Sequence, residues 1–381
     1  MKRIMSLILS SIILLSSFAL LPTTAFAKTT KPKETTYIAS CGVYKNSFGK
    51  VFASKDKLVF QDKKGKKTVL DKASDNFYDK WYRKYTFYMR GKTVYYTKET
   101  WENNFGDGAY SVRIDGTNRK KIGDATFSLL GGYGSAMIFV NRKEVFSCDQ
   151  GKTTKLFNTN NYPAWIFNGK IYCGKKVYNL DTKKTGIYNI RDYKLDYKSD
   201  NNFDSRLEKE KNLVVTTKNY MYFINNNGSL VRLDKAGNKK TVDKGIIKVL
   251  GANNNGNVVY VKKNSKGEES LYRYTSKGNI VMLTTYKSIL KKIQKTNKAE
   301  NENLEKEVYV EEAVLVGGKV LFIGNQRLFS VDNKGGNLKY VIKNVDYEFF
   351  IKSLEACDGR VYYSYVGNGD QESYEVRVKS V

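Results

Sequence analysis

The sequence predicts an all-β protein folded as a β-propeller with four-stranded antiparallel blades. Three observations support this prediction. A unit of about 44 residues recurs along the chain, which is the usual size of one propeller blade. Each copy alternates polar residues with Val, Ile, Tyr and Phe, the period-two pattern of strands. The 381 residues include 29 Tyr but only 3 Pro, a composition typical of folded rather than disordered chains.

The repeat is clearest at Met221, where MYFI, NNNG and SLVRLD indicate a strand, a turn and a second strand, followed by KAGNKKTV. A further strand fits before each such position, as in AVLVGG at Ala313. Eight blades are expected, with seven as the alternative because the first and last copies are irregular. The aligned positions are Val51, Val94, Met137, Ile171, Met221, Val259, Val320 and Val361.

Six copies end their second recognisable strand in Asp and continue into a turn rich in Gly and Lys. An Asp side chain caps such a turn, and Gly supplies the positive φ that the turn needs. These aspartates are therefore expected to have mainly a structural role. They are Asp62, Asp115, Asp149, Asp181, Asp234 and Asp332.

Basic residues recur at the same turns, so a ring of blades should gather them on one rim. The rim serves either solubility or attraction to a polyanion, such as teichoic acid or anionic lipid head groups. Lys far outnumbers Arg here and no nucleic-acid motif is present, which favours diffuse charge attraction over specific phosphate recognition. The rim residues are Lys63, Lys64, Lys66, Lys67, Arg119, Lys120, Lys121, Lys183, Lys184, Lys239 and Lys240.

A family resemblance agrees with the repeat. YYTKE at Tyr95, followed by SVRIDGTNRKKIGD at Ser111, resembles the YWTD repeats of lipoprotein-receptor propellers, although the Trp of that box is missing. The array over residues 36–381 is similar to secreted propeller domains of clostridia and related Gram-positive bacteria, which have no assigned chemistry. The resemblance implies the fold and leaves the function open, because one fold supports many functions.

The first 27 residues are expected to be a secretory signal peptide. Lys2 and Arg3 precede an apolar stretch from Met5 to Leu21, and Ala25-Phe26-Ala27 matches a cleavage site. The expected product is secreted or associated with the cell envelope, with retention as an anchor as the alternative. Cleavage removes two cations and lowers the net charge from +28 to +26. Residues 28–35 should form a flexible tail, and residues 36–381 a single propeller.

An exported chain can keep disulfides. The segment around Thr35–Val43 is expected to close the ring beside the first or last blade, which brings Cys41 near Cys357. Cys148 and Cys173 fall in neighbouring blades. The expected bridges are Cys41–Cys357 and Cys148–Cys173, with four free thiols as the alternative.

Two insertions interrupt the repeat, near residues 188–213 and 286–312. The first carries Asp192, Asp196, Asp200 and Asp204, which indicate a solvated charged loop or, less directly, a cation site. The second contains SILKKIQK from Ser288, a short amphipathic helix with Ile289, Leu290 and Ile293 on one face. This helix either docks on the propeller or forms a partner-binding arm.

The chain has no His, which excludes Ser-His-Asp and Cys-His catalysis and imidazole metal ligands. No catalytic residue, cofactor or metal site is predicted. Trp81, Trp101 and Trp165 either stack on sugars or peptides or pack between blades. The expected function is a monomeric, non-catalytic binding or scaffold module that contacts an extracellular protein or an anionic cell-wall polymer. The alternative is a carbohydrate-active enzyme with a carboxylate pair.

Overall fold

The computed structural model describes residues 34–37, 42–54, 57–72, 83–100, 108–123, 128–140, 143–149, 152–159, 164–188, 214–299, 306–343, 349–367 and 374–381. These residues belong to one compact unit, Glu34–Val381, and the strands of each blade are counted among the described residues. The signal-peptide segment, Trp81, Trp101, Cys41 and the four aspartates of the first insertion lie outside the described residues.

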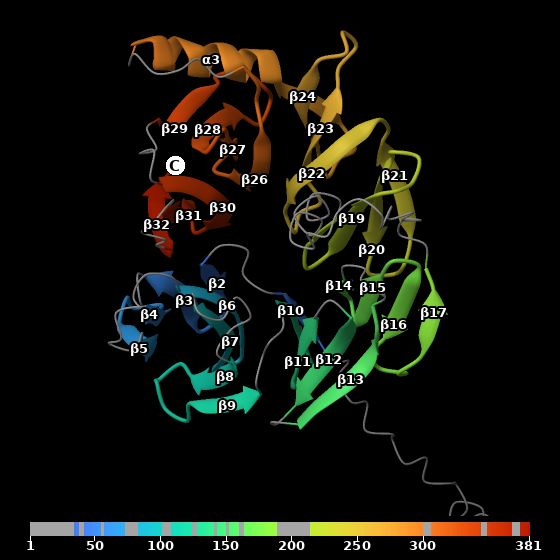
Figure 1. The fold of residues 1–381 in the computed structure, drawn as a ribbon, viewed down its shortest axis with the longest axis vertical. Helices are drawn as coiled ribbons and strands as arrows, with labels where there is room; N and C mark the ends of the chain where they lie inside the picture. The colour runs from blue at the N-terminus through green and yellow to red at the C-terminus, as the bar shows by residue number, and fades with distance from the viewer. Residues whose placement is uncertain are drawn as a thin grey trace, which may run out of the picture. The chain divides into compact units, whose positions relative to one another are not determined.

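The unit is an eight-bladed propeller, as predicted, and Figure 1 follows its chain around the ring. Blade one contains β2 (Val43–Lys45), β3 (Gly49–Ser54), β4 (Lys57–Asp62) and β5 (Lys67–Lys72). Blade two contains β6 (Arg83–Arg90), β7 (Thr93–Thr100), β8 (Gly108–Arg113) and β9 (Lys120–Gly123). Blade three contains β10 (Ser128–Tyr133), β11 (Ala136–Val140), β12 (Glu144–Asp149) and β13 (Lys152–Asn158). Blade four contains β14 (Ala164–Phe167), β15 (Lys170–Cys173), β16 (Lys176–Asn179) and β17 (Thr185–Ile187).

The second half of the ring repeats this arrangement. Blade five contains β18 (Val214–Thr216), β19 (Tyr220–Ile224), β20 (Leu230–Asp234) and β21 (Lys239–Asp243). Blade six contains β22 (Ile246–Ala252), β23 (Val258–Lys263), β24 (Glu269–Tyr274) and β25 (Ile280–Thr285). Blade seven contains β26 (Val310–Val316), β27 (Lys319–Gly324), β28 (Arg327–Asp332) and β29 (Lys339–Ile342). Blade eight contains β30 (Phe349–Cys357), β31 (Arg360–Gly367) and β32 (Tyr374–Ser380), and is therefore one strand short of the expected four.

The eight positions on which the repeat was aligned all lie on the second strand of a blade. All eight side chains, from Val51 to Val361, have 0% relative exposure. Apolar clusters join successive blades through these strands: Val51 and Val94 share one cluster, and Val259 and Val320 share another. Burial of such side chains between blades contributes roughly 25 cal/mol per Å² of apolar surface, which explains why the pattern is visible in the sequence.

The N-terminal strand lies elsewhere than predicted. β1 (Thr35–Tyr37) pairs antiparallel with β10, at the inner edge of blade three, while Val43 begins the first strand of blade one. Glycine in β10 explains the difference, because a Cβ on Gly131 would lie 2.4 Å from the carbonyl oxygen of Thr36. Blade eight instead meets blade one by side-chain packing, in which Val376 contacts the apolar cluster of blades one and two.

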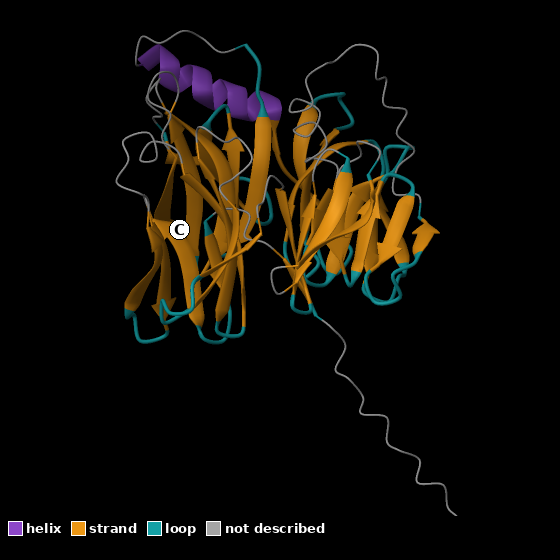
Figure 2. Ribbon diagram, turned by 60° about the horizontal axis from the view of Figure 1, so that its bottom comes forward, coloured by secondary structure: helices purple, strands orange, loops and turns teal. Residues whose placement is uncertain are grey.

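The second insertion forms the helix α3 (Tyr286–Ala299), which docks on the propeller as one of the two alternatives predicted. Its N-terminus is capped by Thr285, whose Oγ1 accepts a 3.1 Å hydrogen bond from the Ser288 amide. Ile289 and Ile293 are completely buried in the cluster shared by blades six and seven. Figure 2 shows the helix lying across the ends of the strands. None of the described helices combines the length and apolar character that a membrane span requires.

Candidate functional site: a basic rim and a central cavity

The turns between the third and fourth strands of blades one, two and five have the structure that the sequence predicts. In blade one, Asp62 Oδ1 accepts hydrogen bonds from the backbone amides of Lys64 and Lys66, both at 2.9 Å. Gly65 between them has a φ of +91°, which a side chain would strain. In blade five, Asp234 Oδ1 accepts the amide of Asn238 at 2.9 Å. These two aspartates therefore organise their turns, which is the role expected for them.

Blade four is an exception to this pattern. Asn179 Oδ1 accepts the amides of Asp181 and Thr182, at 2.9 and 3.1 Å, so Asn179 caps the turn instead of Asp181. The residue with positive φ in this turn is Lys183, at +56°, where blades such as blade one have Gly. It lies four residues after the capping residue, whereas Gly65 lies three residues after Asp62. The role expected for Asp181 is therefore wrong, because the strand β16 ends two residues earlier than the repeat alignment assumes.

All eleven basic residues predicted for the rim are exposed. Strands in a blade are antiparallel, so every turn between third and fourth strands opens on the same face of the ring, together with the turns between first and second strands. The structure therefore places the turns of blades one, two, four and five on one face. Two exposed lysines at equivalent turns, Lys277 in blade six and Lys334 in blade seven, extend this set. The repeat could have identified both, since they stand in SKGN and NKGG.

Not all of the rim cations are equally mobile. Arg119 Nε donates to Tyr96 at 2.9 Å, and its Nη2 lies 3.0 Å from Asp71 Oδ1, so it ties blade two to blade one. Lys239 lies 4.2 Å from the ring centre of Tyr188. No such contact is found among the described residues for six other rim side chains, which are therefore candidates for contact with a ligand: Lys63, Lys64, Lys66, Lys120, Lys183 and Lys184.

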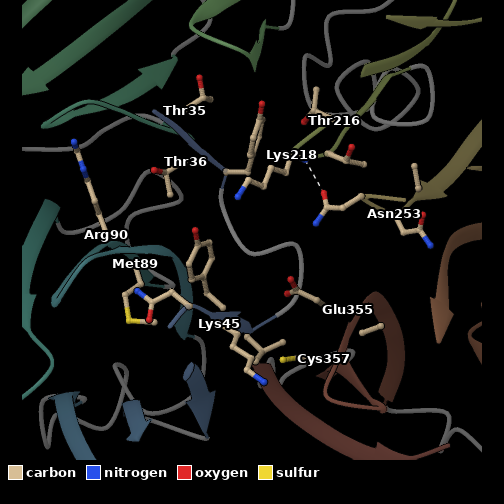
Figure 3. A pocket seen from close by; sticks show the side chains of 18 of the residues that line it. Thr35, Thr36, Lys45, Met89, Arg90, Thr216, Lys218, Asn253, Glu355 and Cys357 are labelled. Atoms are coloured by element: carbon tan, nitrogen blue, oxygen red, sulfur yellow. Dashed lines mark hydrogen bonds between the residues drawn. The ribbon is translucent and has the colours of Figure 1, made fainter. Parts of the chain in front are cut away.

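A central cavity of about 810 Å³ opens on the same face. It is lined by first strands and the turns that follow them, including Asn46 of blade one, Lys218 of blade five and Asn253 of blade six. Figure 3 shows Thr35 and Thr36 of β1 between the side chains of blade two and those of blade five. The inserted strand therefore forms part of the cavity wall. Pockets of this size are typical of small-ligand sites, which range from about 300 to 1,000 Å³.

The cavity walls are polar but their groups already take part in contacts between blades. The Lys218 amide donates to Asn254 Oδ1 at 2.8 Å, and Asn46 Nδ2 donates to the carbonyl oxygen of Gly91 at 2.9 Å. Lys45 forms an ion pair with Asp358, and Lys218 lies 3.9 Å from Glu34. These contacts fix the geometry of the cavity and balance part of its charge.

The Cys357 thiol and the hydroxyls of Tyr37 and Tyr44 along this wall remain protonated at neutral pH. Burial, with a smaller effect of Asp358, raises the pKa of the Cys357 thiol to about 11. Burial likewise raises the pKa of Tyr44 and of Tyr37 to about 12 each. A protonated thiol is a weak nucleophile, so this environment lowers the reactivity of Cys357 at neutral pH.

The expected Cys148–Cys173 disulfide does not form. Neither cysteine forms a disulfide, both are buried, and they lie in different apolar clusters. Cys148 Sγ donates to the carbonyl oxygen of Ile122 at 2.8 Å, because its position on β12 turns it toward blade two. Cys173 faces blade three from the other side. The Cys41–Cys357 bridge remains a prediction, since Cys41 lies outside the described residues, while Cys357 is unpaired within them.

Trp165 lies on the innermost strand of blade four, where it packs half-buried against the apolar cluster of blades four and five. This placement agrees with the packing interpretation, and the two other tryptophans lie outside the described residues. Within the described ranges, no cluster of His, Cys, Asp or Glu has a geometry suited to a metal ion.

A buried polar unit was missed by the sequence reasoning. Tyr260 donates to Asp243 Oδ2 at 2.7 Å, and Lys262 Nζ lies 2.7 Å from the same oxygen. The equivalent residues of blades one and two, Asp71 and Lys98, lie 3.4 Å apart. Two sequence signals mark the unit: an Asp that ends KKTVLD or KKTVD on the fourth strand, and a Tyr-x-Lys on the next second strand.

No protein-family model and no curated protein matches the chain. Among solved structures, the chain is similar to the β-propeller domain of the Trilobed protease from Pyrococcus furiosus, with 11% identity, a TM-score of 0.42, and coverage of 78% of this chain and 95% of that one. It is also similar to a structure from a study of two prolyl endopeptidases, with 8% identity, a TM-score of 0.41, and coverage of 91% of this chain and 50% of that one. The chain is similar to an acylaminoacyl peptidase as well, with 12% identity, a TM-score of 0.38, and coverage of 92% of this chain and 52% of that one. The chain thus spans about half the length of these two peptidase structures, and the likenesses concern fold alone.

Proposed function

We propose that this protein is an exported, non-catalytic propeller that binds an anionic cell-wall polymer through its basic rim. One observation carries the proposal: exposed Lys residues recur at equivalent turns and therefore accumulate on one face of the ring. A surface of one charge sign raises the local concentration of a polyanion and speeds its association. The signal-peptide pattern of residues 1–27 supports a location where teichoic acids are accessible.

The fixed structure of the turns also favours this function. Asp62 and Asp234 hold their turns by backbone hydrogen bonds, so the neighbouring lysines project from fixed backbone positions. A polymer that contacts several turns at once binds more tightly than any single phosphate group, because later contacts are intramolecular.

A salt-dependent pulldown with purified cell wall tests the proposal. We expect the protein to bind at low ionic strength and to dissociate as salt approaches 1 M, where the Debye length falls to about 3 Å. A triple variant with Lys63→Gln, Lys64→Gln and Lys120→Gln should bind several-fold more weakly.

The matched control removes the same charge from the other face. Lys287, Lys291 and Lys295 are exposed on α3, which follows a fourth strand and therefore lies opposite the rim. Substituting these three by Gln should leave binding nearly unchanged. Equal losses in both variants would mean that net charge alone matters. Release of soluble sugar or peptide from the wall by the purified protein would contradict the non-catalytic role.

A further inference from the structure

Blade eight has an open outer edge. Every other blade has at least four strands, but among the described residues blade eight contains only β30, β31 and β32. β32 pairs with β31 from Val366↔Tyr374 to Arg360↔Ser380, and no described strand pairs with its other edge. Such an edge presents a row of backbone N–H and C=O groups that can pair with another polypeptide.

Blade eight exposes an apolar side chain at a position that is buried or half-buried in the other blades. Val378 is opposite Tyr362, the residue after the aligned position of the second strand, and is 50% exposed. The residues at the equivalent place in blades one, six and seven are buried: Val59 is 6%, Tyr272 9% and Ser330 8% exposed. The third strand of blade eight therefore has an apolar residue at this position, as a covered strand would, but its side chain is as exposed as on an outermost strand.

The edge strand contacts neighbouring residues and carries two cations, Arg377 and Lys379, besides Glu375. The Arg377 guanidinium lies 3.9 Å from the ring centre of Tyr365, and Lys379 Nζ donates to the carbonyl oxygen of Val341 at 2.6 Å. Both side chains are exposed, and they alternate with Val378 along the strand. A strand added at this edge therefore meets a cation, an apolar group and a cation at successive positions.

This pattern selects among possible occupants. Two copies of β32 paired antiparallel about Val378 would set Arg377 opposite Lys379, and pairing about Arg377 would oppose two arginines; like charges directly opposite destabilise a sheet. Pairing about Val376 would set Glu375 opposite Arg377 but would leave Lys379 beyond the paired residues, with no carboxylate opposite it. A strand with acidic residues at alternate positions around an apolar residue places a carboxylate opposite each cation. Opposite charges across a strand pair contribute roughly 0.2–1 kcal/mol each.

We propose that the outer edge of β32 is a docking site for an extended segment of a partner polypeptide that alternates acidic and apolar residues. The segment completes blade eight as its fourth strand. Backbone hydrogen bonds provide the affinity, while Arg377, Val378 and Lys379 select the sequence. This site is a strand edge on blade eight and is separate from the basic rim, which consists of turns.

Fluorescence anisotropy with labelled synthetic peptides tests the proposal. The probe is TEVEVET, and its matched control is TEPEPET, which has the same charge but cannot form ladder hydrogen bonds at its prolines. We expect TEVEVET to bind the full chain at least tenfold more tightly than TEPEPET. Amide exchange in Tyr374–Ser380 should slow when TEVEVET is bound, because these backbone groups become paired.

Two variants of β32 and one control complete the design. Arg377→Glu should weaken the binding of TEVEVET at least tenfold and strengthen the binding of the basic peptide TKVKVKT. Val378→Ser keeps all charges and should weaken the binding of TEVEVET several-fold. This variant keeps the test decisive if Arg377→Glu perturbs folding. The rim variant with Lys63→Gln and Lys64→Gln should bind TEVEVET within twofold of the unchanged protein.

Other outcomes would overturn the proposal. Equal binding of TEVEVET and TEPEPET, or loss of binding in the rim variant, would mean charge attraction to the rim without strand pairing. A dimer that forms without peptide and dissociates on Arg377→Glu or Val378→Ser would assign the edge to a second copy of this chain.

Discussion

Lys262 of blade six places its Nζ 2.7 Å from Asp243 Oδ2 of blade five, and both side chains are largely buried between the blades. Tyr260 donates to the same oxygen, and burial followed by this hydrogen bond raises the pKa of its hydroxyl far above the ordinary value. The corresponding pair, Asp71 and Lys98, lies four blades away, on the opposite side of an eight-bladed ring. Two equivalent polar contacts thus fix the ring at opposite interfaces.

Removing one partner of this unit should destabilise the protein strongly. Asp243→Ala leaves Lys262 buried without its counter-ion, so we expect the free energy of unfolding to fall by about 3 kcal/mol in urea denaturation. The double variant Asp243→Leu with Lys262→Met should recover much of this loss, because no uncompensated charge remains. A double variant as unstable as Asp243→Ala would show that the packing, rather than the charge pair, is what matters.

Asp234 should make a pH-dependent contribution to its turn. Hydrogen bonds from Asn238 hold the pKa of this carboxyl below its ordinary value. The stabilisation is therefore complete above the unfolded-state pKa and is lost as pH falls through the lower folded-state pKa. Asp234→Asn should keep the turn and lose this dependence, because Asn253 already caps a turn in the same way with its Oδ1. Thermal unfolding between pH 2 and pH 7 checks this, and Asp234→Ala should lower the Tm at neutral pH.

Gly131→Ala should release β1 from blade three. The added methyl carbon would lie 2.4 Å from the Thr36 carbonyl oxygen, at a φ of +148°. We expect amide exchange in Thr35–Tyr37 to accelerate while exchange in blade five is unchanged. Gly91→Ala is the matched control, since it also has a positive φ but no atom within 4 Å of the new Cβ. If both variants free β1 equally, backbone strain rather than close approach is responsible.

The Cys357 thiol should react slowly with alkylating reagents, although it lines the cavity. With a pKa of about 11, its thiolate fraction at pH 8 is about 100-fold lower than that of a thiol of pKa 9, and the fraction rises tenfold per pH unit. Alkylation followed by peptide mass mapping should show the rate increasing until about pH 11, and Cys357→Ser should remove that signal. A rapid reaction at pH 7 would contradict the environment described, and a peptide joining Cys357 to Cys41 would establish the predicted bridge.

The sequence alone was sufficient to predict much of the ring. Burial between blades requires an apolar side chain at one position of every second strand, so residues such as Val94 and Val259 recur at regular spacing and the eight blades can be counted. The turns were also local enough to predict, because Asp62 and Gly65 interact within five residues. The rim followed from the turns, since equivalent turns of a ring share a face.

Contacts between distant residues were decided by the tertiary structure. β1 pairs with a strand about 95 residues away, and the space left by Gly131 permits that pairing. Cys148 and Cys173 lie in neighbouring blades but point to different interfaces. Side chains alternate between the two faces of a strand, so two cysteines on neighbouring blades need not face each other. The open edge at Val378 likewise depends on which strands pair. Local patterns specify strands and turns through side-chain burial and backbone conformation, whereas edge pairing depends on which backbone groups have space to meet.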